Sequence, residues 1–118
     1  MQDYHQLDIW NRAVAYIVEI YRFSAQLPDG ERYNLTGQLR RAATSVPLNI
    51  AEGAGCSTKG EFARFLGYAY RSLKEVVTAL EVCERLYPAL SAEPLARLVD
   101  EGNQISRMTQ RLISSVGA

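Results

Sequence analysis

The stretch from Leu35 to Gly55, LTGQLRRAATSVPLNIAEGAG, places the tightest constraint on the fold. Its small and apolar residues recur at helical spacing and form a stripe on one side of a helix: Leu35, Leu39, Ala42, Ala43, Val46, Ile50 and Gly53. Small residues also occupy the other sides, and Leu48 falls among polar residues. We therefore expect this helix to make close contacts on more than one side. Pro47 lacks a backbone N–H group, so it predicts a kink or a split of the helix.

A helix is also predicted before this stretch, from Asp8 to Gln26, with Asp8 as its N-cap. Its stripe comprises Trp10, Ala13, Val14, Ile17, Tyr21 and Ser24. The segment 27–30 ends it, because proline disfavours helix in the preceding residue and Asp-Gly favours a turn. Trp10 opens the stripe, which favours a place in the core over a role as an exposed stacking platform.

Two more helices are predicted after the central one. Thr58 and Glu61 match a Thr-x-x-Glu capping box and predict the start of a long helix that Pro88 ends. The last helix is predicted to have Ser91 as N-cap and to accommodate Pro94 in its first turn. No alternating pattern typical of a β-strand occurs in the sequence. Four amphipathic helices with short connections predict an all-α fold, an up-and-down four-helix bundle, and 118 residues fit one domain spanning 1–118.

The runs QLRRAATSVPLNIAEG and KGEFARFLGYAYRSLKEV carry a resemblance to a known family. They resemble small bacterial four-helix-bundle proteins known as 23S rRNA intervening-sequence or S23-like proteins, over nearly the whole chain. The resemblance implies an up-and-down bundle, a homo-oligomeric ring that is a pentamer, and a nucleic-acid partner. Two positions depart from the family pattern: Cys56 stands where relatives commonly have Arg, and Arg71 where they commonly have Gly. One cation is lost and another gained nearby, so individual contact residues do not carry over directly.

Composition excludes several other classes of protein. Apolar residues make up 47% of the chain and charged residues 22%, as in ordinary globular proteins. No segment approaches the roughly 20 apolar residues of a membrane span, and the N-terminus has no secretory pattern, so the cytoplasm is the expected location and no membrane partner is expected. Cys56 and Cys83 would lie about 40 Å apart along one helix, too far for a disulfide, so free thiols are expected. With His5 as the single histidine, no metal site is predicted.

Catalytic chemistry has little support in this sequence. His5 lies near the N-terminus and forms no recognisable Ser-His or Cys-His pairing. The Gly53-Ala54-Gly55 segment before a helix could cradle an anion, but it lacks a following Gly-Lys-Ser or Gly-Lys-Thr, which favours a simple helix stop. We therefore predict that the protein is not an enzyme and has neither a cofactor nor a small-molecule substrate.

Charge is unevenly distributed although the whole chain is neutral. Residues 1–31 carry a net charge of −3, residues 32–74 carry +5 and residues 75–118 carry −2. A basic middle segment can form a local positive surface that the total conceals. Most of its cations are arginines, which suit bidentate contacts with phosphate but also suit ion pairs at subunit interfaces.

The third predicted helix contains the main candidate binding residues. Arg64 and Arg71 lie two turns apart on one face, with Tyr68 between them and Lys74 nearby. Cations interleaved with an aromatic residue suit phosphate contact and base stacking. The alternative is an ordinary solvated face with an Arg71–Glu75 pair.

The central helix adds further candidates. Arg40 and Arg41 are weaker candidates for nucleic-acid binding, because a subunit interface could engage them instead. Arg41, Leu48, Asn49 and Glu52 are predicted oligomer-interface residues, and the alternative for Asn49 and Glu52 is contact with a substrate or base. Arg41 and Glu52 share a face but lie about 16 Å apart along the axis, so they could pair only between subunits.

These observations predict a non-enzymatic, oligomeric, nucleic-acid-binding protein. The alternative is an oligomeric scaffold whose arginines serve subunit contacts and whose partner is another protein. The sequence leaves open whether the partner is RNA or DNA.

Overall fold

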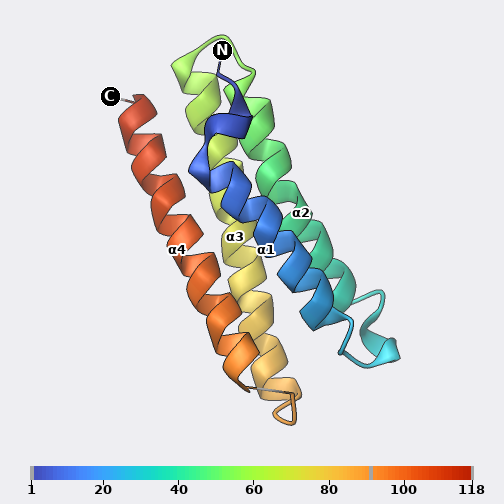
Figure 1. The fold of residues 1–118 in the computed structure, drawn as a ribbon. Helices are drawn as coiled ribbons and strands as arrows, with labels where there is room; N and C mark the ends of the chain where they lie inside the picture. The colour runs from blue at the N-terminus through green and yellow to red at the C-terminus, as the bar shows by residue number, and fades with distance from the viewer. Residues whose placement is uncertain (1, 91, 118) are drawn as a thin grey trace.

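The computed structural model describes residues 2–90 and 92–117, which form four long helices (Figure 1). They are α1 (Asp8–Ser24), α2 (Leu35–Ala54), α3 (Lys59–Leu86) and α4 (Ala92–Gly117). Two short 3-10 helices, η1 (Tyr4–Gln6) and η2 (Asp29–Glu31), precede α1 and α2. Successive helices run in opposite directions along a molecule of 46 × 23 × 19 Å, which confirms the all-α, up-and-down four-helix bundle.

Helix α1 differs from the prediction at both ends. Its N-cap is Leu7, and Asp8 is the first helical residue. There the positive end of the helix dipole stabilises the Asp8 carboxylate. The helix ends at Ser24 instead of Gln26. The backbone N–H groups of Gln26 and Leu27 donate to carbonyls three residues earlier, because the chain tightens into a turn before Pro28.

Helix α2 continues through Pro47, so the predicted split does not occur. A proline removes one backbone hydrogen bond, but Pro47 is itself buried and lies between the fully buried residues Val46 and Ile50. The packing of this face holds the helix together across the missing bond. The helix ends at Ala54, as the Gly53-Ala54-Gly55 segment predicts.

The boundaries of α3 follow its predicted signals. The Thr58 hydroxyl accepts a hydrogen bond from the Glu61 backbone N–H at 3.1 Å and donates to the Glu61 carboxylate at 3.0 Å. Helix α3 ends at Leu86, two residues before Pro88. Pro94 lies in the first turn of α4, as predicted, whereas the predicted N-cap Ser91 lies outside the described residues.

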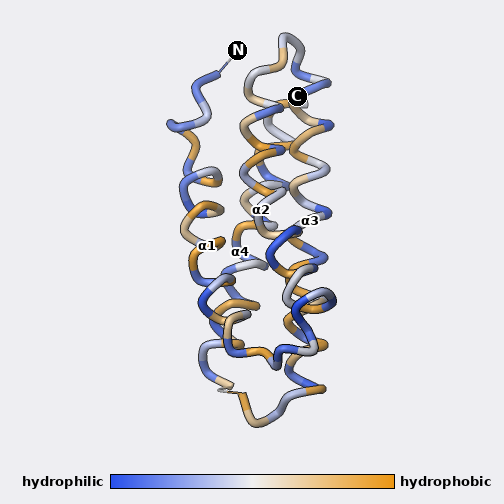
Figure 2. Tube along the Cα trace, turned by 90° about the vertical axis from the view of Figure 1, so that its right-hand side faces the viewer, coloured by the Kyte–Doolittle hydropathy of each residue, from blue (hydrophilic) through white to orange (hydrophobic). Residues whose placement is uncertain are grey.

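The core lies along the inward stripes of all four helices, and the hydrophobic and hydrophilic residues alternate along each helix in Figure 2. Its fully buried large side chains are Tyr16, Ile20, Leu39, Ile50, Leu66, Leu73, Leu80, Leu98 and Ile105. Trp10 packs half-buried against this core, as predicted. Cys83 is buried and Cys56 is half-buried, both as free thiols, and burial raises the pKa of the Cys83 thiol to about 11.

Two glycines let the helices approach closely. A Cβ atom at Gly53 would lie 2.9 Å from side-chain atoms of both Phe62 and Phe65, so this position brings α2 against α3. A Cβ atom at Gly102 would lie 2.7 Å from both the Tyr16 hydroxyl and a Val77 methyl group, so α4 meets α1 and α3 there. Both contacts explain why glycine stands inside a helix despite its low helix propensity.

Polar contacts attach α1 to its neighbours. The Arg12 guanidinium of α1 forms an ion pair with Glu101 of α4, with Nε to Oε2 at 3.1 Å, and also donates to Gln104. The Tyr16 hydroxyl donates to the Leu98 carbonyl at 2.7 Å, and burial raises the pKa of Tyr16.

No helix among the described residues is both long and apolar enough to cross a membrane.

Candidate nucleic-acid interface

The outward face of α3 presents the predicted cations to solvent. Arg64, Tyr68 and Arg71 are all exposed, and their spacing of four and three residues places them on one side of the helix. Lys74 is exposed beside them. The structure therefore brings together the four candidate residues of the third predicted helix.

Each of these cations lies near an aromatic ring of its own helix. The Arg64 guanidinium carbon is 5.4 Å from the centre of the Phe65 ring, and that of Arg71 is 5.9 Å from the Tyr68 ring centre. The Lys74 ammonium is 5.2 Å from the Tyr70 ring centre. Such contacts hold a long side chain along the helix without neutralising its charge.

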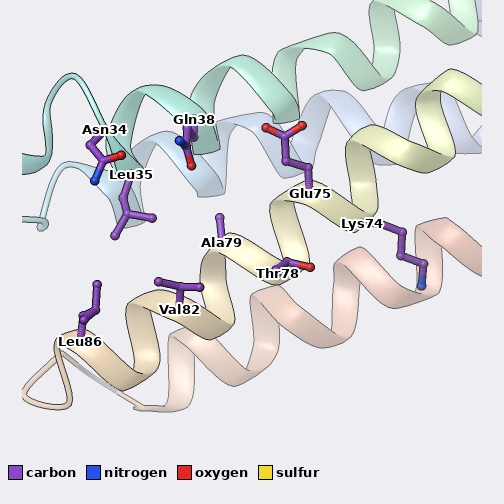
Figure 3. A pocket seen from close by; sticks show the side chains of 9 residues that line it. All are labelled: Asn34, Leu35, Gln38, Lys74, Glu75, Thr78, Ala79, Val82 and Leu86. Carbon is purple, nitrogen blue, oxygen red and sulfur yellow. The ribbon is translucent and has the colours of Figure 1, made fainter.

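No carboxylate neutralises this face within the described residues. The alternative Arg71–Glu75 ion pair does not form, and no hydrogen bond or ion pair between described residues engages the side chains of Arg64, Arg71 or Lys74. In Figure 3 the Glu75 side chain points toward α2, whereas that of Lys74 points toward α4. The positive charges therefore remain available to an external anion.

The two arginines of α2 have different environments. The Arg40 guanidinium donates to the Ser24 hydroxyl at 2.8 Å and to the Tyr21 carbonyl at 3.2 Å, and it lies 4.5 Å from the Tyr21 ring centre. It therefore binds at the C-terminal end of α1, where the negative end of the helix dipole favours a cation. Arg41, the next residue, is exposed and makes no such contact.

The predicted interface residues lie mainly on the outer side of α2. Arg41, Leu48 and Glu52 are exposed, and Leu48 has 64% of its surface accessible. Asn49 is half-buried, and its amide donates to the Ser45 carbonyl of its own helix at 2.8 Å. Ser45 in turn donates to Ser72 of α3 at 2.6 Å, so Asn49 lies at the α2–α3 seam.

A second apolar surface lies in a groove of about 550 Å³ between the start of α2 and the latter half of α3 (Figure 3). Its apolar lining comprises Leu35, Ala79, Val82 and Leu86. Val82 and Leu86 are exposed by 41% and 56%. Val82 and Leu86 lie four residues apart on one side of α3, so their exposed side chains are neighbours along the groove.

Two arginines that the sequence analysis did not assign also lie free on the surface. Arg107 and Arg111 of α4 are exposed, and no described carboxylate pairs with either. The sequence does contain a signal for them, since no acidic residue follows Glu101.

The described residues offer little catalytic geometry. His5 is exposed, and its Nδ1 forms a hydrogen bond with the Asp3 carboxylate oxygen at 2.8 Å. This hydrogen bond lowers the pKa of Asp3. No group of three or more potential metal ligands comes together in the ranges 2–90 and 92–117.

Comparison with known proteins identifies the family. A crystal structure of a protein with unknown function, from the S23 ribosomal protein family of Bacteroides thetaiotaomicron, has the same fold with a TM-score of 0.78. It is 19% identical, and the similarity covers 89% of this chain and 97% of that chain. No curated protein matches the sequence. Residues 5–111 match the model of the family described as "23S rRNA-intervening sequence protein", which confirms the resemblance. The chain belongs to the 23S rRNA-intervening sequence protein family.

Proposed function

We propose that this protein binds nucleic acid without catalysing a reaction, through an arginine-rich surface repeated around a homopentameric ring. The observation that carries the proposal is the outward face of α3, where Arg64, Arg71 and Lys74 are exposed and free of carboxylate partners in the described structure. A polyanion is the natural partner for such a face. The family's name, which refers to an intervening sequence of 23S rRNA, supports a nucleic-acid partner.

Repetition of the face compensates for its small size. One bundle presents only a few cations and has no net charge, so a single copy should bind weakly. Several copies on one ring would act together on a long polyanion, which raises overall affinity without any new contact.

The apolar surface supports assembly. Leu48 projects from α2 between Arg41 and Glu52, which could form ion pairs with neighbouring subunits, and the groove at Val82 and Leu86 offers a second apolar contact. Two different surfaces on one subunit suit head-to-tail contacts that close into a ring. We expect Leu48→Glu to reduce the oligomer measured by light scattering while helix content by circular dichroism stays unchanged. A monomeric wild-type protein at micromolar concentration would contradict the ring.

The test of binding uses Arg64→Glu with Arg71→Glu in the full-length protein. We expect this double variant to lose binding to mixed RNA and DNA, while light scattering shows an intact oligomer. Wild-type binding should weaken steeply as salt rises, because phosphate contacts release counterions. A wild-type oligomer that binds neither RNA nor DNA at low salt would refute the proposal.

The alternative function is an assembly scaffold that binds another protein. The exposed apolar side chains on α2 and α3 favour this alternative. It predicts that Arg64→Glu with Arg71→Glu breaks the oligomer, because the arginines would then be interface residues. The same double variant therefore separates the two functions.

A further inference from the structure

The second half of α4 is a basic surface that the proposed binding residues do not include. Arg107 and Arg111 are exposed, and no carboxylate occurs between Gly102 and Gly117. The helix dipole does not account for these arginines, because it stabilises cations only in the last turn and both arginines precede that turn. Their side chains, together with those of Gln110 and Ser114, line an open hollow of about 660 Å³.

Helix packing brings these arginines level with those of α3. Gly102 of α4 lies against Val77 of α3, and the two helices run in opposite directions. Arg71 precedes Val77 by about 9 Å along α3, and Arg107 follows Gly102 by about 8 Å along α4. Because the helices are antiparallel, both displacements point toward the same end of the bundle, so Arg71 and Arg107 lie at nearly the same height.

The orientation of neighbouring side chains places these cations on adjoining surfaces. Arg12 of α1 contacts Glu101 and Met108, which marks the side of α4 that faces α1. Arg107 lies about 100° around the helix from Met108, on the exposed side away from that contact. On α3, Lys74 points toward α4 (Figure 3). Lys74 and Arg107 therefore approach the same α3–α4 edge from its two sides.

We propose that α3 and α4 form one phosphate-binding surface, the α3–α4 basic face, made of Arg64, Arg71, Lys74, Arg107 and Arg111. It rests on the proposed nucleic-acid function and specifies its ligand as the sugar-phosphate backbone of a duplex, bound without regard to sequence. Two neighbouring helices lie about 8–10 Å apart, so cations on both can contact more phosphates than one row can. The rings of Phe65, Tyr68 and Tyr70 already have cations of their own helix beside them, which favours phosphate contact over base stacking.

The experiment uses Arg107→Gln with Arg111→Gln, which removes two charges and keeps good helix formers. The matched control is Arg22→Gln with Arg32→Gln, which removes two exposed arginines outside α3 and α4 that have no ion pair among the described residues. A third variant, Arg107→Lys with Arg111→Lys, keeps the charge. Binding to RNA and DNA duplexes of mixed sequence, to scrambled duplexes of equal length and to the separate single strands is titrated at several salt concentrations.

We expect the Arg107→Gln, Arg111→Gln variant to bind about tenfold more weakly, with a salt slope lower by about 2 for each engaged subunit. The control and the lysine variant should bind within about twofold of the wild type, and scrambled duplexes should bind equally. If the Arg107→Gln, Arg111→Gln variant instead keeps the wild-type affinity and salt slope while Arg64→Glu with Arg71→Glu loses binding, α4 is excluded from the phosphate-binding surface. A strong preference for one duplex sequence would refute backbone recognition. Binding to single strands without binding to duplexes would refute the duplex as the ligand, and failure of the wild type to bind any of these nucleic acids would instead refute the proposed function itself.

Discussion

The close contact at Gly102 gives the sharpest prediction about stability. In Gly102→Ala, the new Cβ atom would lie 2.7 Å from the Tyr16 hydroxyl oxygen and 2.7 Å from a Val77 methyl carbon. Neither neighbour can move freely, because Tyr16 is buried and donates to the Leu98 carbonyl at 2.7 Å. Overpacking costs about 1–3 kcal/mol, and a weakened buried hydrogen bond costs about 1–3 kcal/mol more. Alanine returns about 1 kcal/mol of helix propensity, so the net loss lies in the range of about 1–5 kcal/mol, with about 3 kcal/mol at its centre.

A matched substitution on α3 should have the opposite effect. A Cβ atom at Gly67 would meet nothing within 4 Å, so Gly67→Ala should stabilise the protein by about 0.5–1 kcal/mol. Thermal unfolding at one protein concentration measures both, and the Gly102→Ala midpoint should fall by about 10 °C. If Gly102→Ala unfolds at or above the wild-type temperature, α4 does not approach Tyr16 and Val77 as closely as described.

Two further substitutions test local interactions. Thr58→Ala should cost about 1 kcal/mol in urea unfolding, whereas Thr58→Ser should be nearly neutral, because the capping hydroxyl is retained; equal losses would contradict the cap. Glu31 accepts a hydrogen bond from the Tyr87 hydroxyl, which lowers the pKa of Glu31 from its ordinary value of 4.5. Its contribution to stability is therefore present above that value and lost as pH falls through the lowered pKa. Glu31→Gln should be less stable than the wild type at neutral pH, and the difference should shrink as the pH falls below 4.5 and Glu31 becomes protonated; a difference that stays constant in acid would contradict this role.

Much of the fold could be predicted because its signals are local. The capping box at Thr58, the stop before Pro88 and the long apolar stripes each depend on residues close together in the sequence. The course of α2 through Pro47 does not follow from local signals, because the backbone hydrogen bond that proline removes opposes the packing of Val46 and Ile50. Burial of the whole α2 face outweighs one missing hydrogen bond, and that balance depends on the neighbouring helices.

The candidate site could be predicted only in part, because free and engaged arginines look alike in a sequence. Arg40 and Arg41 are adjacent and both were candidates, yet Arg40 contacts residues of α1 and Arg41 is exposed. Helix pairing decides between these two environments. Pairing also places Arg107 level with Arg71, although 36 residues separate them in the sequence.

The division between free and engaged arginines explains how a neutral chain can present a basic face. Arg12 and Arg40 hold α1 against α4 and α2, so their charges are balanced by a carboxylate or by carbonyl groups. α1 is the shortest of the four helices, and such polar contacts supplement its packing. Arg64, Arg71 and Arg107 lack these contacts among the described residues, and their side chains are exposed. Arg22 and Arg32 are exposed and without an ion pair among the described residues as well, so a basic face forms only where helix pairing brings free arginines together, and total charge or arginine content does not decide where that is.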